Sequence, residues 1–214
     1  MELYSFCFSS TSYRVRIALA LKGLDYQYRS INLRKGDQKS ESYTELNPAK
    51  GVPLLVTDSG EHISQSMAIL NYLEEAYPEP ALLPKELMLK TRILSFCNNI
   101  ASDIHPVNNL RILGYLTNQL GVSEEQKSDW YKHWIKEGMR AVEAQLVTNA
   151  TGQFCFGNEV TLADVCLIPQ VGNALRFGCD MSDYPRSMEI YERCIELPAF
   201  VAAAPTNQPD FANL

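Results

Sequence analysis

The sequence lacks long hydrophobic runs and any excess of basic residues. Its longest apolar stretches, such as Ile17 to Leu21, are far shorter than the roughly 20 residues that a membrane-spanning helix needs. Lysine and arginine together number 19, against 25 aspartate and glutamate residues, which gives a net charge of −6. An acidic chain does not attract the phosphates of nucleic acids or of anionic membranes. We therefore expect neither a nucleic-acid partner nor a membrane association.

The six cysteines lack the paired spacing of metal and disulfide sites. The six are Cys7, Cys97, Cys155, Cys166, Cys179 and Cys194. No two of them form a C-x-x-C pair, and most have apolar neighbours in the sequence. The first residues, MELYSFCF, carry an acidic residue at position 2 and no basic segment, so they do not resemble a secretory signal. We therefore expect reduced, buried thiols in a cytoplasmic protein without a metal site.

Strand and helix patterns alternate through the first 80 residues. The sequence predicts strands over 3–6 and 26–32, a helix over 13–22, a hairpin of strands near 54–56 and 62–63, and a helix over 64–77. The short connection between the first two strands requires a right-handed crossover and therefore a parallel pair. We expect an α/β domain over residues 1–80.

Three prolines follow this region within seven residues. Pro78, Pro80 and Pro84 suit neither a helix interior nor a strand interior, so we place a linker over 78–85. Only helical patterns follow, with capping boxes that begin at Ser123 and Thr161. The almost wholly apolar residues after the second box predict a buried central helix. The sequence thus predicts an all-helical second domain over 86–214.

Candidate ligand-binding positions lie where helices begin. Ser9-Ser10-Thr11-Ser12 supplies four hydroxyls at the end of a strand, and the N–H groups of a helix N-terminus can hold an anion or a thiolate. A plain helix cap by Ser10 or Thr11 is the alternative. A cis bond at Val52-Pro53 would expose backbone to a ligand. Gln65-Ser66 precedes another helix, where a carboxylate or again a cap would fit.

These pieces, in this order, resemble the cytosolic glutathione transferases. The stretch Ser9-Ser10-Thr11-Ser12-Tyr13-Arg14-Val15-Arg16-Ile17-Ala18-Leu19 is similar to the zeta-class signature of maleylacetoacetate isomerases. Further matches are Leu46-Asn47-Pro48, Val52-Pro53, Gln65-Ser66, Asp103-Ile104-His105-Pro106, Asn108-Asn109, 157–164, Ile168-Pro169-Gln170-Val171 and Gln208-Pro209-Asp210. The resemblance covers essentially the whole chain. It implies a thioredoxin-like α/β domain, an all-α domain and a homodimer.

The resemblance also implies that glutathione is the cofactor. Ser9 would lie beside the glutathione sulfur and favour its thiolate, with Ser10 and Thr11 adjacent. A hydroxyl that donates to the thiolate lowers the thiol pKa, and the thiolate is the nucleophile. Val52 would bind the cysteinyl part through its backbone. The full set of implied glutathione positions is Ser9, Ser10, Thr11, Gln38, Val52, Gln65, Ser66, His105 and Asn109.

The implied reaction is the cis–trans isomerisation of maleylacetoacetate to fumarylacetoacetate in the breakdown of tyrosine and phenylalanine. Glutathione would add to the cis double bond and leave again after rotation. Ser9, Ser10 and Arg176 are the implied catalytic residues. Arg176 and Arg111 match family arginines near a substrate with two carboxylates, which arginine can meet bidentately. From the sequence alone a helix-surface arginine is the favoured interpretation of Arg176, and only the family resemblance reverses it.

Two residues depart from the family pattern. Phe8 stands where arginine is common, and Thr11 stands where cysteine is usual, a change shared with some maleylpyruvate isomerases. Maleylpyruvate isomerase, a broader glutathione transferase or thioltransferase, and a non-catalytic protein of the same fold therefore remain alternatives. A thioltransferase would need an exposed Cys7 with a lowered pKa, whereas a buried strand thiol is the reading we favour.

Overall fold

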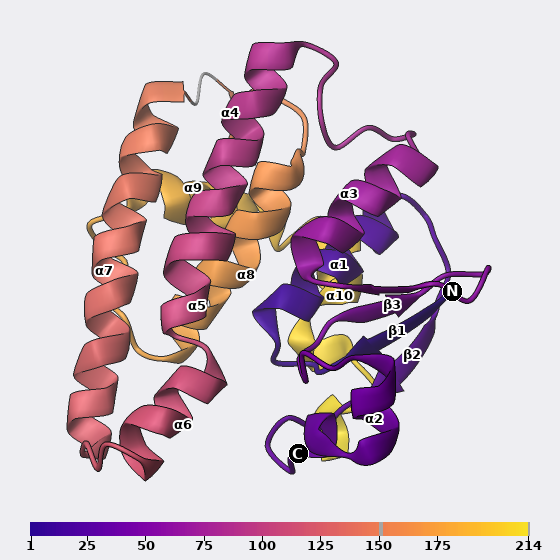
Figure 1. The fold of residues 1–214 in the computed structure, drawn as a ribbon. Helices are drawn as coiled ribbons and strands as arrows, with labels where there is room; N and C mark the ends of the chain where they lie inside the picture. The colour runs from indigo at the N-terminus through magenta and orange to yellow at the C-terminus, as the bar shows by residue number, and fades with distance from the viewer. Residues whose placement is uncertain (150–151, 214) are drawn as a thin grey trace. The chain divides into compact units, whose positions relative to one another are not determined.

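The computed structural model describes residues 1–149 and 152–213, and the chain divides into two units. The first unit comprises Met1–Ala81 and the segment that begins at Ile195, and the second comprises Leu82–Cys194 (Figure 1). The division between Ala81 and Leu82 falls inside the linker that the prolines predict.

The first unit is built on a four-stranded mixed sheet. Its strands are β1 (Glu2–Ser5), β2 (Gln27–Ser30), β3 (Leu54–Val56) and β4 (His62–Ser64), in the order β2-β1-β3-β4. The β1 and β2 strands pair in parallel, with Leu3 opposite Tyr28, whereas β3 is antiparallel to both β1 and β4. The predicted crossover and the predicted hairpin are therefore confirmed.

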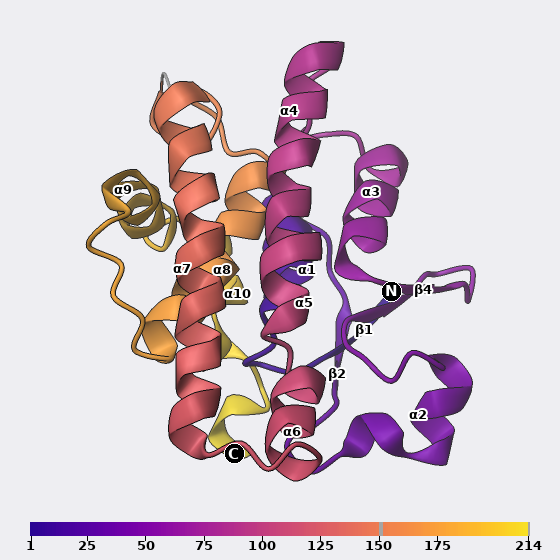
Figure 2. The same cartoon turned by 60° about the vertical axis from the view of Figure 1, so that its left-hand side comes forward.

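Helices cover both faces of this sheet (Figures 1 and 2). Helices α1 (Ser10–Leu21) and α3 (Ser66–Ala76) pack against each other on one face. The 3₁₀ turn η1 (Asp37–Lys39) and α2 (Glu41–Leu46) lie on the other. Fully buried apolar side chains of the strands and of α1 and α3, including Leu3, Leu55, Ile17 and Ile69, form the core between them. Burial of such side chains is the main stabilising contribution to the sheet and helix layers.

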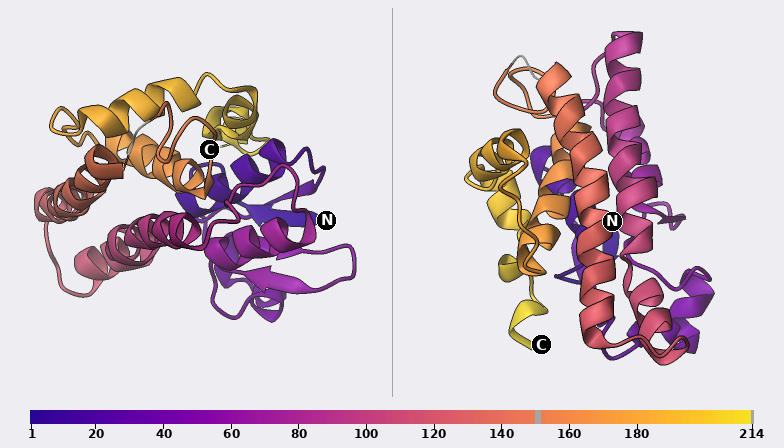
Figure 3. Two further views of the ribbon diagram at one scale, coloured as in Figure 1. Left: turned by 90° about the horizontal axis from the view of Figure 1, so that it is seen from above. Right: turned by 90° about the vertical axis from the view of Figure 1, so that its left-hand side faces the viewer.

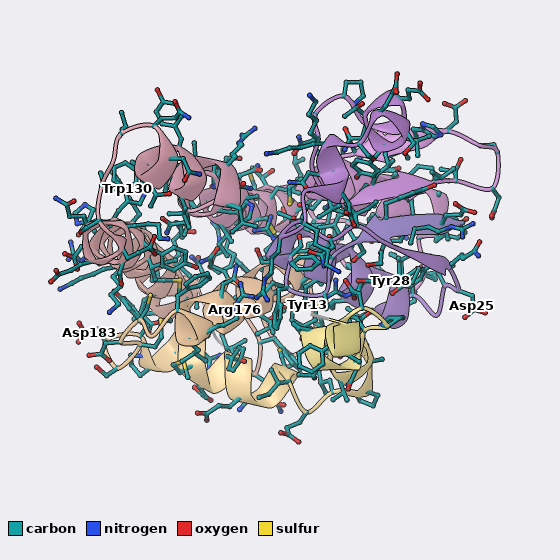
Figure 4. All side chains as sticks on the ribbon, turned by 90° about the horizontal axis from the view of Figure 1, so that it is seen from below. Tyr13, Asp25, Tyr28, Trp130, Arg176 and Asp183 are labelled. Carbon is teal, nitrogen blue, oxygen red and sulfur yellow. The ribbon has the colours of Figure 1, made fainter. Side chains whose placement is uncertain are left out.

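The C-terminal segment belongs to the first unit, which corrects the assignment of all residues from 86 to 214 to the helical domain. It contains α10 (Pro198–Ala203) and the 3₁₀ turns η3 (Pro205–Asn207) and η4 (Phe211–Asn213). Arg16 of α1 is fully buried, and its Nε donates to the carbonyl of Ala203 at 2.9 Å. The hydroxyl of Tyr13, labelled in Figure 4, donates to the carbonyl of Phe200 at 3.2 Å. Polar groups buried on α1 thus find their partners at the end of the chain.

The second unit is a set of helices. In chain order these are α4 (Leu87–Asn98), the π-helical turn η2 (Asn99–Ile104), α5 (His105–Val107), α6 (Leu110–Asn118), α7 (Glu124–Asn149), α8 (Leu162–Arg176) and α9 (Pro185–Cys194). Helix α8 packs against α4 and α9 (Figure 3). Its residues Val165–Ile168 are fully buried, which confirms the predicted central helix.

Both predicted capping boxes are present. At α8, the Thr161 side chain accepts from Ala163 N–H at 3.3 Å and Asp164 accepts from Thr161 N–H at 2.8 Å. At α7, Ser123 and Gln126 exchange the corresponding bonds at 3.1 and 2.8 Å. Each box satisfies backbone donors that a helix start leaves unpaired, so local sequence alone fixes these two starts.

Within the described residues, no helix combines the length and hydrophobicity needed to cross a membrane. The same part of the chain contains no group of His, Cys, Asp and Glu side chains arranged to hold a metal ion. All six cysteines are free thiols, and all except the half-buried Cys179 are buried.

Candidate active site

The serine cluster lies at the start of α1, where Ser9 is the N-cap residue. Its backbone is extended, with φ −75° and ψ 115°, and its Oγ accepts from Ser12 N–H at 3.2 Å. Ser10 is the first residue of the helix and is buried. A helix cap, which the sequence left as an alternative to chemistry, is therefore present, but Ser9 supplies it and not Ser10 or Thr11.

A chain of hydroxyls joins this helix start to the loop before β3. The Thr11 hydroxyl donates to the carbonyl of Val52 at 2.9 Å, and its oxygen lies 2.9 Å from the Ser9 Oγ. Threonine has a single hydroxyl proton, and the carbonyl takes it, so Ser9 is the donor in the bond between the two hydroxyls. Three of the predicted site residues, Ser9, Thr11 and Val52, are therefore held together in one directed network.

The backbone is unusual at two predicted positions of the first unit, Val52 and Gln65. The Val52-Pro53 bond is cis. Gln65 has a φ of 72°, which is uncommon for a residue with a side chain, and it stands exposed immediately before α3. The next residue, Ser66, is buried, and its Oγ accepts from the Arg14 guanidinium at 3.3 Å. The first N–H groups of α3 and the exposed Gln65 side chain are thus presented at one helix start.

Gln38 presents an unused acceptor. It lies in η1 and is half-buried, while its Oε1 is shielded from solvent and meets no donor among the residues that the structure describes. A shielded carbonyl oxygen without a donor is costly, about 1–3 kcal/mol. An N–H group of a ligand would satisfy it.

Two predicted glutathione-binding residues lie in the second unit, His105 and Asn109, and their side chains contact each other. His105 follows the π-helical turn and begins α5, and Asn109 is the N-cap of α6. Asn109 Oδ1 accepts from Arg111 N–H at 3.1 Å, and its Nδ2 lies 3.3 Å from His105 Nε2. Because the amide oxygen faces a donor, the amide nitrogen faces the imidazole. His105 Nε2 is therefore an acceptor, which puts the proton of the neutral ring on Nδ1.

The two predicted substrate arginines stand on different helices of this unit. Arg111 is an exposed residue in the first turn of α6. Arg176, labelled in Figure 4, is the exposed last residue of α8, and its guanidinium donates to Asn173 Oδ1 at 2.9 Å. Its Cζ also lies 4.9 Å from the centroid of the Phe177 ring. The ring and the amide therefore hold the Arg176 guanidinium in one orientation.

Cys7 does not have the properties of a nucleophile. It is fully buried, and burial, followed by the charge of Asp210, raises the pKa of its thiol to about 11. Asp210 Oδ2 accepts from Cys7 N–H at 3.0 Å, and Oδ1 accepts from the hydroxyl of Tyr28, labelled in Figure 4, at 2.8 Å. The thiol therefore stays protonated at neutral pH, as a buried strand thiol should.

Sequence reasoning missed three residues that shape this region: Arg14, Arg34 and Asp210. Arg14 lies between apolar residues of α1, which could have marked it as a buried charge with a fixed partner. Asp210 closes a motif that the resemblance includes, but its contact with Cys7 joins residues 203 positions apart. Arg34 lies over the Phe8 ring, and no pattern in the sequence connects them.

Comparison with known proteins identifies the family. Residues 1–75 match the family model of the glutathione S-transferase N-terminal domain. The chain is 47% identical over 210 residues to a probable maleylacetoacetate isomerase of Vibrio cholerae, and the match covers 97% of each chain. The chain belongs to the maleylacetoacetate isomerase family of zeta-class glutathione transferases.

Solved structures of this family share the fold. A zeta-class maleylpyruvate isomerase in its holo form superposes with a TM-score of 0.95 at 42% identity, covering 98% of this chain and 99% of that one. A maleylacetoacetate isomerase from Methylobacterium extorquens AM1, solved with bound malonate and glutathione, gives a TM-score of 0.95 at 35% identity, covering 98% of both chains. The expected glutathione transferase fold, a thioredoxin-like domain followed by a helical domain, is confirmed.

Proposed function

We propose that this protein is a glutathione-dependent cis–trans isomerase that converts maleylacetoacetate to fumarylacetoacetate in the breakdown of aromatic amino acids. The observation that carries the proposal is the directed hydroxyl chain from Ser9 through Thr11 to Val52 at the start of α1. It stands at the position where the family holds the glutathione sulfur. Membership of a family of isomerases supports the same reaction class.

Glutathione is the proposed cofactor, and its sulfur lies at the α1 N-terminus. Ser9 turns its hydroxyl from Thr11 to the thiolate, and the first N–H groups of the helix add their positive potential. Val52 binds the cysteinyl part through its backbone, and Gln38 offers its unused Oε1. The complete proposed glutathione set comprises Ser9, Ser10, Thr11, Gln38, Val52, Gln65, Ser66, His105 and Asn109.

In the proposed mechanism the thiolate attacks one carbon of the cis double bond and forms a C–S bond. The electrons of the double bond move to the neighbouring carbonyl, which becomes an enolate, and the former double bond rotates as a single bond. When the enolate collapses, the C–S bond breaks, the trans double bond forms and glutathione leaves as the thiolate. Ser9 and Ser10 stabilise the thiolate. Arg176 orients a carboxylate and stabilises the enolate charge.

The substrate carries two carboxylates, whereas the protein has a net charge of −6. Local cations must therefore offset the overall repulsion. Arg176 and Arg111 are the proposed substrate cations of the second unit, since both are exposed and arginine is always charged.

Maleylpyruvate is the second candidate substrate. The chain is 42% identical to the maleylpyruvate isomerase whose fold it matches with a TM-score of 0.95. Thr11 and Arg111 are also features shared with some maleylpyruvate isomerases. The burial and raised pKa of Cys7, in contrast, argue against a thioltransferase that uses this thiol.

We further infer a cytoplasmic homodimer. Six free thiols suit a reducing compartment. Sedimentation at micromolar concentration is expected to give a species of twice the chain mass of 24.1 kDa. A species of the single-chain mass would contradict the dimer.

The function is tested by isomerisation assays with both maleyl substrates, with and without glutathione. We expect a rate with at least one substrate that requires glutathione. Ser9→Ala should reduce kcat/KM by about a hundredfold, a typical loss for one donor to a developing charge. Ser123→Ala is the matched control, because it removes the capping hydroxyl of α7 as Ser9→Ala removes that of α1. Each change lowers the free energy of unfolding by about 1 kcal/mol, but only Ser9→Ala should reduce kcat/KM. The absence of any glutathione-dependent rate with either substrate would contradict the proposal.

A further inference from the structure

An aromatic cluster surrounds the residue that precedes Ser9. The Phe8 ring meets Phe6 edge-on, with 6.3 Å between ring centroids, and Phe211 of the C-terminal segment at 5.7 Å. The guanidinium carbon of Arg34 lies 5.2 Å from the Phe8 centroid. The position where the family commonly carries arginine thus holds a ring with an arginine from another segment above it.

The loop that carries Arg34 is fixed by its own hydrogen bonds. Asn32 Oδ1 accepts from the N–H groups of Arg34 and Lys35 at 3.0 and 3.1 Å. Asp37 Oδ2 in turn accepts from Asn32 N–H at 3.0 Å, and Gly36 supplies the positive φ of 86° that the turn requires. The backbone therefore holds Arg34 in place, and the Phe8 ring sets the direction of its side chain.

The Arg34 guanidinium has its donors available. The residue is exposed, and no carboxylate in the described part of the chain lies within 4.0 Å of its nitrogens. An arginine above an aromatic ring uses its face for that contact and leaves the N–H groups in its plane free for a carboxylate. The ring also restricts the side chain in advance, which reduces the entropy lost on binding.

We propose that Arg34, held over Phe8, binds one carboxylate of the dicarboxylate substrate beside Ser9. The inference rests on the proposed function, because it places the substrate at the glutathione sulfur. Phe8 directly precedes Ser9, so the Arg34 guanidinium lies over a ring of the turn that leads into Ser9. The family resemblance implies that Gln65 and Ser66, at the start of α3, hold the γ-glutamyl end of glutathione, so Arg34 is not needed for that carboxylate. Arg34 therefore supplies the charge that the substitution of arginine by Phe8 removes.

Arg34→Gln tests the proposal, and Lys35→Gln is its matched control. Lys35 is the neighbouring exposed cation of the same loop, and its N–H also bonds to Asn32. We expect Arg34→Gln to reduce kcat/KM for the maleyl substrate about tenfold, with the KM for glutathione unchanged. Lys35→Gln should change kcat/KM by less than about twofold. Equal effects of the two variants, or a raised KM for glutathione alone, would overturn the proposal.

Binding of malonate, a dicarboxylate that cannot be isomerised, separates this inference from the proposed function. Calorimetry in the presence of glutathione should show malonate binding to the unmodified protein and to Lys35→Gln, and about tenfold weaker binding to Arg34→Gln. Phe8→Leu keeps the cation but removes the ring, so it should weaken binding in part and non-additively with Arg34→Gln. If the protein isomerises neither maleyl substrate, the proposed function fails. The malonate measurements still test whether Arg34 binds a carboxylate. Undetectable malonate binding, or equal binding by all variants, overturns the proposal.

Discussion

The hydroxyl chain at the start of α1 makes a quantitative prediction for Thr11→Val. Valine keeps the shape of threonine but removes the hydroxyl, and with it the 2.9 Å bond to the carbonyl of Val52 and the 2.9 Å contact with Ser9. Each hydrogen bond contributes about 0.5–1.5 kcal/mol to stability, and this variant loses two of them. We therefore expect the free energy of unfolding to fall by about 2 kcal/mol.

For a chain of this length each kcal/mol corresponds to about 2–4 °C in Tm, so thermal unfolding followed by circular dichroism should show a decrease of about 4–8 °C. Thr11→Ser is the matched control, because it loses only a methyl group and keeps the hydroxyl. Its Tm should lie close to that of the unmodified protein. The KM for glutathione should rise in Thr11→Val and change little in Thr11→Ser. If the two variants unfold at the same temperature and bind glutathione equally, the hydroxyl chain does not organise the site.

Two further predictions concern the end of the chain and the first strand. Asp210→Asn removes a buried carboxylate that accepts hydrogen bonds from Cys7 N–H and from the Tyr28 hydroxyl. It should lower the free energy of unfolding, measured by urea denaturation, by about 1.5–3 kcal/mol. An unchanged free energy of unfolding would contradict this. The pKa of the Cys7 thiol rises from 9.0 to about 11 on folding, so its contribution to stability is present below pH 9 and is lost as the pH rises towards 11. Cys7→Ala should therefore lose less stability between pH 9 and 11 than the unmodified protein, and parallel pH profiles would refute this.

Much of the first unit could be predicted because its signals are local. The Ser9 to Ser12 cluster, Gly23 and the turn at 58–60 mark the boundaries of α1 and of the β3–β4 hairpin. The capping boxes at Ser123 and Thr161 fix two helix starts from four residues each. Such signals act within one turn of a helix or hairpin, so the sequence contains the whole interaction.

The C-terminal segment could not be predicted because its contacts are distant in sequence. Helical periodicity identified α10 as part of a helical region, but packing on α1 depends on Arg16 meeting the carbonyl of Ala203, 187 positions away. A buried arginine in a helix indicates that a hydrogen-bond partner exists, but it does not indicate which segment supplies that partner.

The candidate site also combines local features, which the sequence predicts, with contacts between distant segments, which it does not. Ser9, Thr11, Gln65 and Ser66 stand at helix starts, where sequence and local geometry coincide. The bond from Thr11 to Val52 and the contact of Arg34 with Phe8 join separate segments, so only the structure reveals them. The family resemblance supplied the roles of the site residues, whereas their hydrogen-bond directions come from the geometry.

The most direct test of the central claim is the number of product molecules formed for each molecule of glutathione. A maleyl substrate is mixed with the protein and about one hundredth of its amount of glutathione, and product and glutathione are followed by proton NMR. An isomerase returns glutathione after each cycle, so we predict complete conversion to the trans product with all glutathione recovered as the free thiol. A reaction that stops at one product per glutathione, with the thiol converted to a thioether, would contradict the account and identify a conjugating transferase.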